Sequence, residues 1–231
     1  MAIAFVNSAS TAGGSGGGTT NAVDTSGANL VVYGRPRFSA PTITDSKSNT
    51  ITPLTEQTAV APNYLMLYAE NAVTGASHDA TAAGGSSFSS LIMSAYSGAA
   101  TSSVLDQQAG ASGVSVNRAP GSLTPSEDNC LVVTGIGWDG DGLVLSIDGG
   151  FTIREQEAYS GGNNYGTAMA DLIQTTAANA NPLWTWDGSG HDNSATIAVF
   201  KAGVAAPAAA ATLALWMRFV GHRMRRRRRQ G

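Results

Sequence analysis

The feature that most constrains this chain is a series of short apolar runs, each about as long as a β-strand. Gly, Pro, Asn, Asp or Ser bounds nearly every run, and no long helical periodicity occurs before Val204. The runs span residues 30–33, 64–69, 88–96, 130–138, 143–147, 151–155, 167–174, 183–186 and 196–200. Runs such as 64–68 and 196–201 alternate with period two, which places every other side chain on one face. The pattern predicts an all-β fold, an antiparallel two-sheet jelly-roll sandwich.

The chain is expected to contain one domain and a short appendage. Its 231 residues suit one large all-β domain, and we place the β-sandwich at residues 1–203. Within it, Thr11–Thr20 is rich in Gly, Ser and Thr and is expected to be a mobile loop. Residues 204–231 begin with an alanine-rich stretch that predicts a helix from about Pro207 to about Met224, followed by an arginine-rich tail.

The charges divide between these two parts. Up to Met217 there are six basic side chains against all sixteen acidic ones, a formal charge of −10, whereas the last fourteen residues hold seven arginines and no acid. An acidic body argues against nucleic-acid binding by the body, because phosphate contacts need clustered Lys or Arg. The two parts should therefore have different partners.

The single cysteine and the N-terminal sequence limit the cysteine chemistry and the cellular compartment that we expect for this chain. Cys130 is the single cysteine, so the chain has no internal disulfide and no four-cysteine metal site, and its apolar neighbours predict a buried, inert thiol. Met1–Ser8 lacks the charged and apolar regions of a secretory signal. We expect the chain to be made in the cytoplasm of its producer.

The order of strands and loops resembles lectin-like (concanavalin-type) jelly-roll modules of phage and environmental virus structural proteins and of bacterial extracellular proteins. The likeness covers about residues 2–202. It lies in the stretches 3–5, 29–32, 94–98 with 105–106, 128–133, 151–154, 168–171 and 195–201. The matching motifs are strand patterns, so the resemblance implies a fold and leaves function open. Such modules often carry a Trp-containing segment where this chain has Tyr33–Arg37. Any surface formed by this segment is therefore specific to this chain and is not shared with the family.

The tail is similar to the C-terminal sorting signals of some Gram-negative exported proteins. An apolar segment, residues 211–215, precedes an arginine cluster, as in those signals. Of the Pro-Glu-Pro motif that precedes the apolar helix there, Pro207 alone remains. The resemblance implies anchoring of an exported protein, and it competes with a docking helix as the interpretation of this segment.

Three patterns could carry catalysis, and each has a simpler structural interpretation. Gly13–Gly17 spells Gly-x-Ser-x-Gly but lies in low-complexity sequence and not between a strand and a helix. His78 and His191 each precede an Asp and could meet to bind a metal or polarise a serine, although loop histidines beside Asp are more often solvated. Glu155 and Glu157 face one side of a strand, where adjacent exposed charge is a better interpretation than a glycosidase pair. We predict no catalytic residues and no enzyme.

Two further sets could bind ligands. Asp139 and Asp141 offer oxygen ligands for calcium, although Asp-Gly pairs are also the commonest hairpin turns and the EF-hand spacing is absent. Calcium is therefore the one cofactor considered. Trp138, Trp184 and Trp186 could form a stacking platform for sugar rings if they are exposed, but strands this apolar favour core positions for all three.

The C-terminal segment is the predicted anchor. A helix from Pro207 would align four apolar side chains in one stripe suited to a partner: Leu213, Trp216, Met217 and Val220. The arginine run that follows could contact nucleic acid, an anionic membrane or an acidic protein surface: Arg225, Arg226, Arg227, Arg228 and Arg229. The apolar part falls short of the roughly 20 strongly apolar residues that span a bilayer.

Together these features predict a non-enzymatic virion structural protein of a tailed phage, either a head decoration (cement) protein or a tail or fibre component. Its sandwich would face outward, its C-terminal segment would anchor or assemble it, and symmetry favours a homo-oligomer in contact with other virion proteins. The alternative is a bacterial extracellular or cell-surface module that binds carbohydrate and is held by its C-terminal segment.

Overall fold

The computed structural model describes residues 2–14, 17–37, 42–83, 89–161 and 164–203, and these contain β-strands and no helix. In chain order the strands are β1 (Ala4–Gly14), β2 (Gly17–Thr19), β3 (Leu30–Arg37), β4 (Thr42–Asp45), β5 (Thr52–Pro53), β6 (Asn63–Glu70), β7 (Ala80–Ala83), β8 (Ser89–Ser97), β9 (Leu105–Ser115), β10 (Asn117–Arg118), β11 (Cys130–Trp138), β12 (Ser146–Ile147), β13 (Thr152–Glu157), β14 (Gly166–Gln174), β15 (Trp184–Thr185) and β16 (His191–Phe200).

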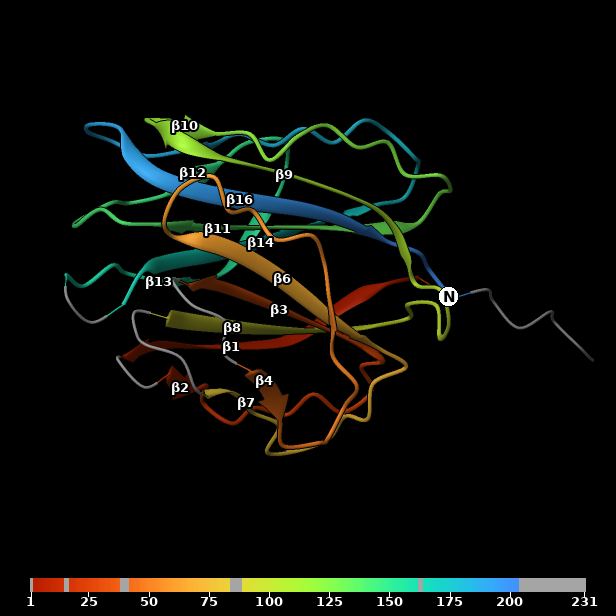
Figure 1. Ribbon diagram of the computed structural model, residues 1–231. Coiled ribbons are helices and arrows are strands. Elements are labelled where there is room, and N and C mark those ends of the chain that lie inside the picture. The colour runs from red at the N-terminus through yellow and green to blue at the C-terminus, as the bar shows by residue number, and fades with distance from the viewer. Residues whose placement is uncertain (1, 15–16, 38–41, 84–88, 162–163, 204–231) are drawn as a thin grey trace, which may run out of the picture.

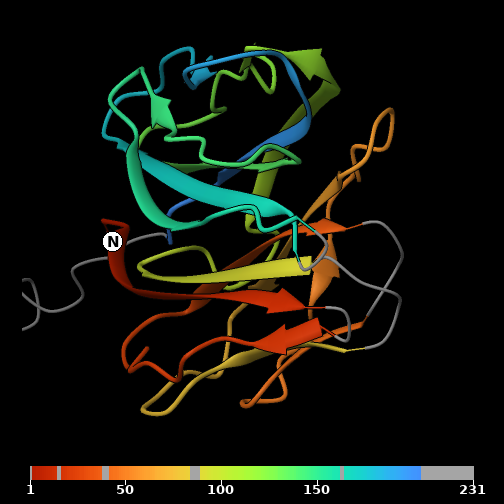
Figure 2. The same cartoon turned by 90° about the vertical axis from the view of Figure 1, so that its left-hand side faces the viewer.

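The strands form four antiparallel sheets arranged in layers. A five-stranded sheet, β1-β8-β3-β6-β5, packs against a second five-stranded sheet, β13-β14-β11-β16-β9. A three-stranded sheet covers the outer side of each, β2-β7-β4 on the first and β10-β15-β12 on the second. Figure 1 shows β1–β8 in the lower part of the molecule and β9–β16 in the upper part, and the turned view separates the same two halves (Figure 2).

The second half repeats the strand order of the first. Adding eight to each strand number converts β1-β8-β3-β6-β5 into β9-β16-β11-β14-β13, which is the second five-stranded sheet read from its other edge. The same addition converts β2-β7-β4 into β10-β15-β12. The register aligns Leu30–Gly34 (LVVYG) with Leu131–Gly135 (LVVTG), because the glycine that ends each segment pairs with a methionine, Met66 in the first half and Met169 in the second. The body is therefore two copies of one eight-stranded unit.

Side chains alternate between the two faces of each strand, and together they form three hydrophobic cores. On β3, Leu30 and Val32 enter the central core between the five-stranded sheets, while Val31 and Tyr33 enter the outer core under β2-β7-β4. The strand β11 divides its side chains in the same way between the central core and the outer core under β10-β15-β12. Because both faces of these strands are covered, their sequences are almost continuously apolar.

The central core is closely packed where two glycines face Tyr64. A Cβ atom placed on Gly135 would lie 2.0 Å from the Tyr64 hydroxyl oxygen, and one on Gly34 would lie 2.3 Å from it. Tyr64 is fully buried. The two glycines, equivalent in the two halves, are what allows the five-stranded sheets to approach each other around this ring.

The all-β, sandwich-like prediction is confirmed, and each apolar run contributes a strand. The predicted number of sheets is wrong: the described strands form four sheets and not two, because both faces of the central strands are covered. The prediction for Thr11–Thr20 is wrong in its described residues: β1 continues to Gly14 and pairs with β8, and Gly17–Thr19 forms β2. Backbone pairing holds these residues in sheets although their side chains bury little. The strand β9, rich in Gly, Ala, Ser and Gln, was not predicted. No helix in the described part of the chain is long and apolar enough to cross a membrane.

Candidate functional site

The first half contains a buried line of hydroxyl, imidazole and carboxylate. Thr25 Oγ1 lies 2.8 Å from His78 Nδ1, and His78 Nε2 lies 3.1 Å from Asp45 Oδ2. The Tyr33 hydroxyl donates to the same carboxylate oxygen at 2.6 Å, and Asn49 Nδ2 donates to it at 2.7 Å. The residue types and their order match those of a nucleophile, base and orienting acid.

This line is closed to a substrate. The side chains of His78 and Asp45 are fully buried, and so is Thr25. The Thr25 hydroxyl also lies 3.2 Å from the Gly75 carbonyl oxygen and accepts from the Gly75 amide at 3.1 Å. These contacts tie residues 75–78 to β4, so the group serves as a structural hydrogen-bond network. The expectation that His78 is solvated is therefore wrong.

Burial and hydrogen bonding compete at Asp45. Burial by itself would raise the pKa of the carboxyl, but hydrogen bonds from His78, Tyr33 and Asn49 outweigh it and hold the pKa well below its ordinary value. For Tyr33, burial and then the hydrogen bond to Asp45 both raise the pKa. The ionised Asp45 and neutral Tyr33 are the forms that this network stabilises.

We expect an acid-dependent loss of stability from this site. The folded pKa of Asp45 lies below the unfolded value of about 3.9, so its contribution to the unfolding free energy is complete above that pH and declines as the pH falls below it. Urea titrations between pH 7 and pH 2 should show a smaller loss below about pH 4 for Asp45→Asn than for the parent chain. Parallel losses in the two proteins would contradict the assignment.

Polar contacts also join the two halves of the body. Ser8 Oγ and Ser10 Oγ on β1 donate to the Glu155 carboxylate on β13 at 2.6 and 3.0 Å, and Ser10 Oγ lies 2.6 Å from Glu157 Oε1. The two glutamates thus face the same side, as predicted. They are partly buried structural acceptors and not simply exposed charges.

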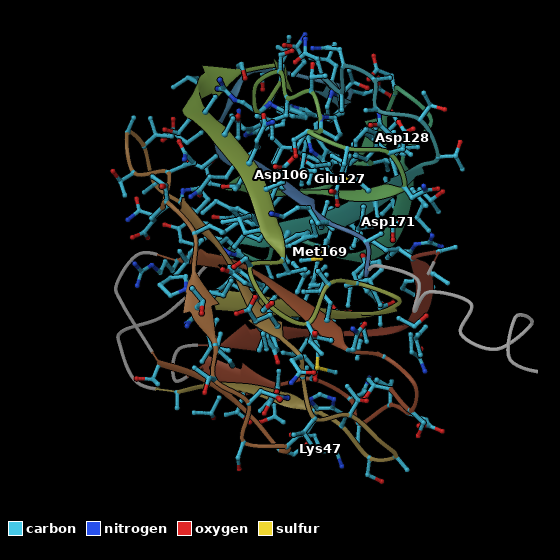
Figure 3. All side chains as sticks on the ribbon, turned by 90° about the vertical axis from the view of Figure 1, so that its right-hand side faces the viewer. Lys47, Asp106, Glu127, Asp128, Met169 and Asp171 are labelled. Carbon is cyan, nitrogen blue, oxygen red and sulfur yellow. The ribbon has the colours of Figure 1, made fainter. Side chains whose placement is uncertain are left out.

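Arg154 and Asp171 form a bidentate ion pair beside this contact. Arg154 donates from Nε and Nη2 to the two oxygens of the Asp171 carboxylate, each at 2.8 Å, and its guanidinium lies 4.1 Å above the centre of the Phe5 ring. Asp171 is nearly fully buried, and Figure 3 places it near the N-terminal strand of the first half. The arginine therefore links a carboxylate of the second half to an aromatic ring of the first.

The calcium candidates Asp139 and Asp141 do not belong to a metal-binding group among the described residues. Asp139 Oδ1 lies 3.8 Å from His191 Nδ1, and burial, followed by the nearby charge of Asp192, raises the pKa of Asp139. Asp141 and Gly142 form a turn in which Gly142 has φ +69°, so the turn interpretation is confirmed. The described residues contain no group of three or more His, Cys, Asp or Glu side chains that could hold a metal.

The three tryptophans lie in the outer core of the second half, as the core interpretation predicted. Trp138, Trp184 and Trp186 are 1%, 0% and 7% exposed, so they cannot form a stacking platform. The Trp184 indole donates to Thr134 Oγ1 at 3.2 Å, and the Trp138 indole donates to the Gly140 carbonyl at 3.2 Å. Their role is packing between β11 and the three-stranded sheet.

Neither Cys130 nor His191 forms a reactive site with the side chains around it in the described part of the chain. Cys130 is buried, and burial, followed by the charges of Glu127 and Asp106, raises its pKa to about 11. This fits the predicted inert thiol. His78 and His191 belong to different halves, and no ion pair or hydrogen bond joins them among the described residues. They do not form the shared metal or catalytic site that was considered.

Acidic side chains cluster beside the last described residues. Asp106 accepts from the amide and hydroxyl of Ser126 at 2.8 and 2.7 Å, and Glu127 and Asp128 follow in the chain (Figure 3). Asp106 and Glu127 lie near enough to Cys130 to raise its pKa, and the Ala202 backbone contacts that thiol. The predicted anchor lies outside the described residues: Leu213, Trp216, Met217, Val220 and Arg225–Arg229.

Sequence reasoning missed two features that bear on function. The first is the internal repeat. Its sequence signal is the motif Leu-Val-Val-x-Gly, which occurs at residues 30–34 and again at 131–135. The second is Arg35, a buried arginine that follows the first of these segments.

No protein-family model, curated protein or solved structure matches the chain.

Proposed function

We propose that the chain is a non-enzymatic structural protein of a tailed-phage virion, a head decoration protein or a tail or fibre component. The observation that carries the proposal is the duplicated strand order. With the strands of each half numbered from 1 to 8, the order is 1-8-3-6-5 in one sheet and 2-7-4 in the other, and we take this order as the winding of an eight-stranded jelly roll. Jelly rolls recur in viral capsid proteins and in lectins.

The use of the polar side chains supports a structural role. Thr25, His78 and Asp45 have the chemistry of a catalytic triad but are sealed inside the first half. Glu155 and Glu157 accept hydrogen bonds from the opposite half. Side chains that could have carried hydrolysis are thus engaged in holding strands together, as a rigid building block requires.

The division of charge supports anchoring through the C-terminal segment. The acidic body and the seven arginines of the tail carry opposite formal charges. An arginine run is suited to an acidic protein surface, and repeated subunits of a virion would present such a surface many times. In this proposal the body faces outward, and the tail joins it to neighbouring virion proteins or to another copy of the chain.

The alternative is a bacterial extracellular or cell-surface module that binds glycans and is anchored by residues 204–231. The same strand order favours it, because lectins share the jelly roll. The two proposals differ in where the chain is found: in assembled particles or in the cell envelope.

The virion proposal can be tested on purified particles of the phage whose genome encodes the chain. Mass spectrometry should find the chain at many copies per particle. A variant with Arg225–Arg229 replaced by Ser should lose co-sedimentation with particles while its body stays folded by circular dichroism. Absence from particles together with recovery in the envelope fraction would reject the virion proposal in favour of the alternative.

A further inference from the structure

The strand β9 forms one edge of the second five-stranded sheet, where it lies beside β16 (Figure 1). The two strands pair in an unbroken antiparallel register from Gln107 to Ser115. Alternate residues of such an edge strand direct their N–H and C=O groups away from the paired neighbour. Among the described residues, no backbone hydrogen bond joins β9 to any strand or loop other than β16. The outer edge of β9 therefore carries a row of unpaired backbone donors and acceptors.

The other edges of the two five-stranded sheets are protected in ways that β9 is not. The strand β5 has two residues, and one of them is Pro53. The registers of β1 with β8 and of β13 with β14 are interrupted, and β13 also carries charged side chains, Arg154, Glu155 and Glu157. Short length, proline, bulges and charge are the usual means by which proteins prevent strand edges from pairing with other chains. The stretch Gln107–Ser115 of β9 has no proline and no charged side chain.

Neighbouring loops hold the side chains of β9 on both faces of the sheet. Gln108 Oε1 accepts from the Thr55 amide at 2.8 Å, and on the opposite face Gln107 Nε2 donates to the Thr124 carbonyl oxygen at 2.7 Å. Every residue of β9 is nevertheless at least partly exposed. A partner strand would therefore meet an edge that is already ordered and open to solvent.

Exposed apolar side chains lie at the end of this edge. The described residues contain four exposed large hydrophobic side chains, and two of them are Val114 and Val116, which are 68% and 49% exposed. Val114 belongs to β9, and Val116 follows its last residue, Ser115. A strand added to the edge would remove part of this apolar surface from water.

We infer that β9 pairs with β9 of a second copy of this chain, antiparallel and with the twofold axis at Ala111. Ala111 is the middle of the stretch Gln107–Ser115, whose side chains are uncharged, so self-pairing brings no like charges together. Asp106, the single charge of β9, would lie opposite Val116 of the second copy. A twofold contact uses the same surface twice, and it would join the second five-stranded sheets of the two copies into one continuous sheet.

Sedimentation velocity of the full chain across a dilution series tests this inference. The parent should be a dimer that dissociates on dilution. Ala111→Lys places two positive charges opposite each other at the axis, and Ala111→Glu places two negative ones there. Each variant should raise the dissociation constant by about a hundredfold or more. An equimolar mixture of the two variants should dimerise again, which would also show that both are folded.

Two control variants separate this edge from the rest of the chain. Val73→Lys changes a valine of the first half that is 62% exposed, and it should leave the dimer unchanged. Replacement of Arg225–Arg229 by Ser should also leave it unchanged, because the edge belongs to the body. If neither Ala111 variant folds, Val114→Lys provides a further test: its exposed position tolerates the charge, and it should weaken the dimer by about tenfold or more.

Amide hydrogen exchange locates the contact. Exchange in β9 should slow as the concentration of the parent rises, whereas exchange in β13, the opposite edge of the same sheet, should not change. A parent that stays monomeric at every concentration would overturn the inference, and so would an Ala111→Lys variant that dimerises as tightly as the parent. None of these outcomes depends on whether the chain is part of a virion.

Discussion

Asp45→Ala is expected to destabilise the protein by about 3–5 kcal/mol, the cost of leaving the partner of a buried carboxylate without its counterpart. The fully buried Asp45 carboxylate accepts from Tyr33, His78 and Asn49, and also from the Lys47 amide at 3.2 Å. Its removal leaves the Tyr33 hydroxyl without its acceptor and His78 Nε2 without its partner inside the core. Equilibrium urea unfolding at pH 7, followed by tryptophan fluorescence, measures the loss.

Asp79→Ala is the matched control for this change. Asp79 directly follows His78, but its carboxylate has no hydrogen bond or ion pair among the described residues, so its replacement should alter stability by less than about 0.5 kcal/mol. In a double-mutant cycle, Asp45→Ala and Tyr33→Phe should be strongly non-additive because the two side chains share one hydrogen bond. Additive losses would show that the network does not act as a unit.

Gly135→Val is expected to destabilise the contact between the two halves by about 3 kcal/mol, at the upper end of the cost of overpacking a core. The new Cβ would lie 2.0 Å from Tyr64 Oη and 2.7 Å from Tyr64 Cζ, inside van der Waals contact. The ring is fully buried between the five-stranded sheets, so relief requires the sheets to separate. Thermal unfolding and amide hydrogen exchange of β3 and β11 measure the effect.

Gly14→Val provides the control for the glycine substitution. A Cβ atom on Gly14 would meet nothing within 4 Å. A β-branched residue there costs little in a strand and reduces the freedom of the unfolded chain. Gly14→Val should therefore leave stability within about 0.5 kcal/mol of the parent. If Gly135→Val were equally silent, the close packing of the two halves around Tyr64 would be wrong.

The strands of the central core were predictable because they are covered on both faces. Leu30–Tyr33 and Cys130–Trp138 read as continuous apolar runs between turn residues, and this pattern leaves few alternatives to a buried strand. The strand β9 was not predictable in this way. Its Gln, Gly, Ala and Ser side chains give no apolar period, and it is a strand because its backbone pairs with β16 at the edge of the sheet.

The polar sites were less predictable than the strands, because they depend on contacts between distant segments. Asp45 and His78 are 33 residues apart, and Ser8 and Glu155 are 147 apart, so the sequence around each gives no sign of its partner. The neighbour of His78 in sequence, Asp79, suggested a solvated pair, but the chain turns His78 inward toward Asp45. The burial of the tryptophans was easier to predict, because the apolar strands that contain them already favoured core positions.

The internal repeat was detectable but weak. Leu-Val-Val-x-Gly recurs 101 positions later, whereas the equivalents Tyr96 and Phe200 keep only their aromatic character. Strand order outlasts sequence identity because it is fixed by packing and backbone pairing. The same divergence explains Arg35, which stands where the second half keeps Ile136.

Electron cryo-microscopy of the assembled particle tests the central claim most directly. If the chain is a virion protein, we expect density at symmetry-related positions for a body of two eight-stranded units, joined through their five-stranded sheets, with its C-terminal end directed toward the particle. The map would identify the chain by its side chains, starting with Trp138 and Trp184. A fully assigned map in which every surface and tail protein is another chain would contradict the account.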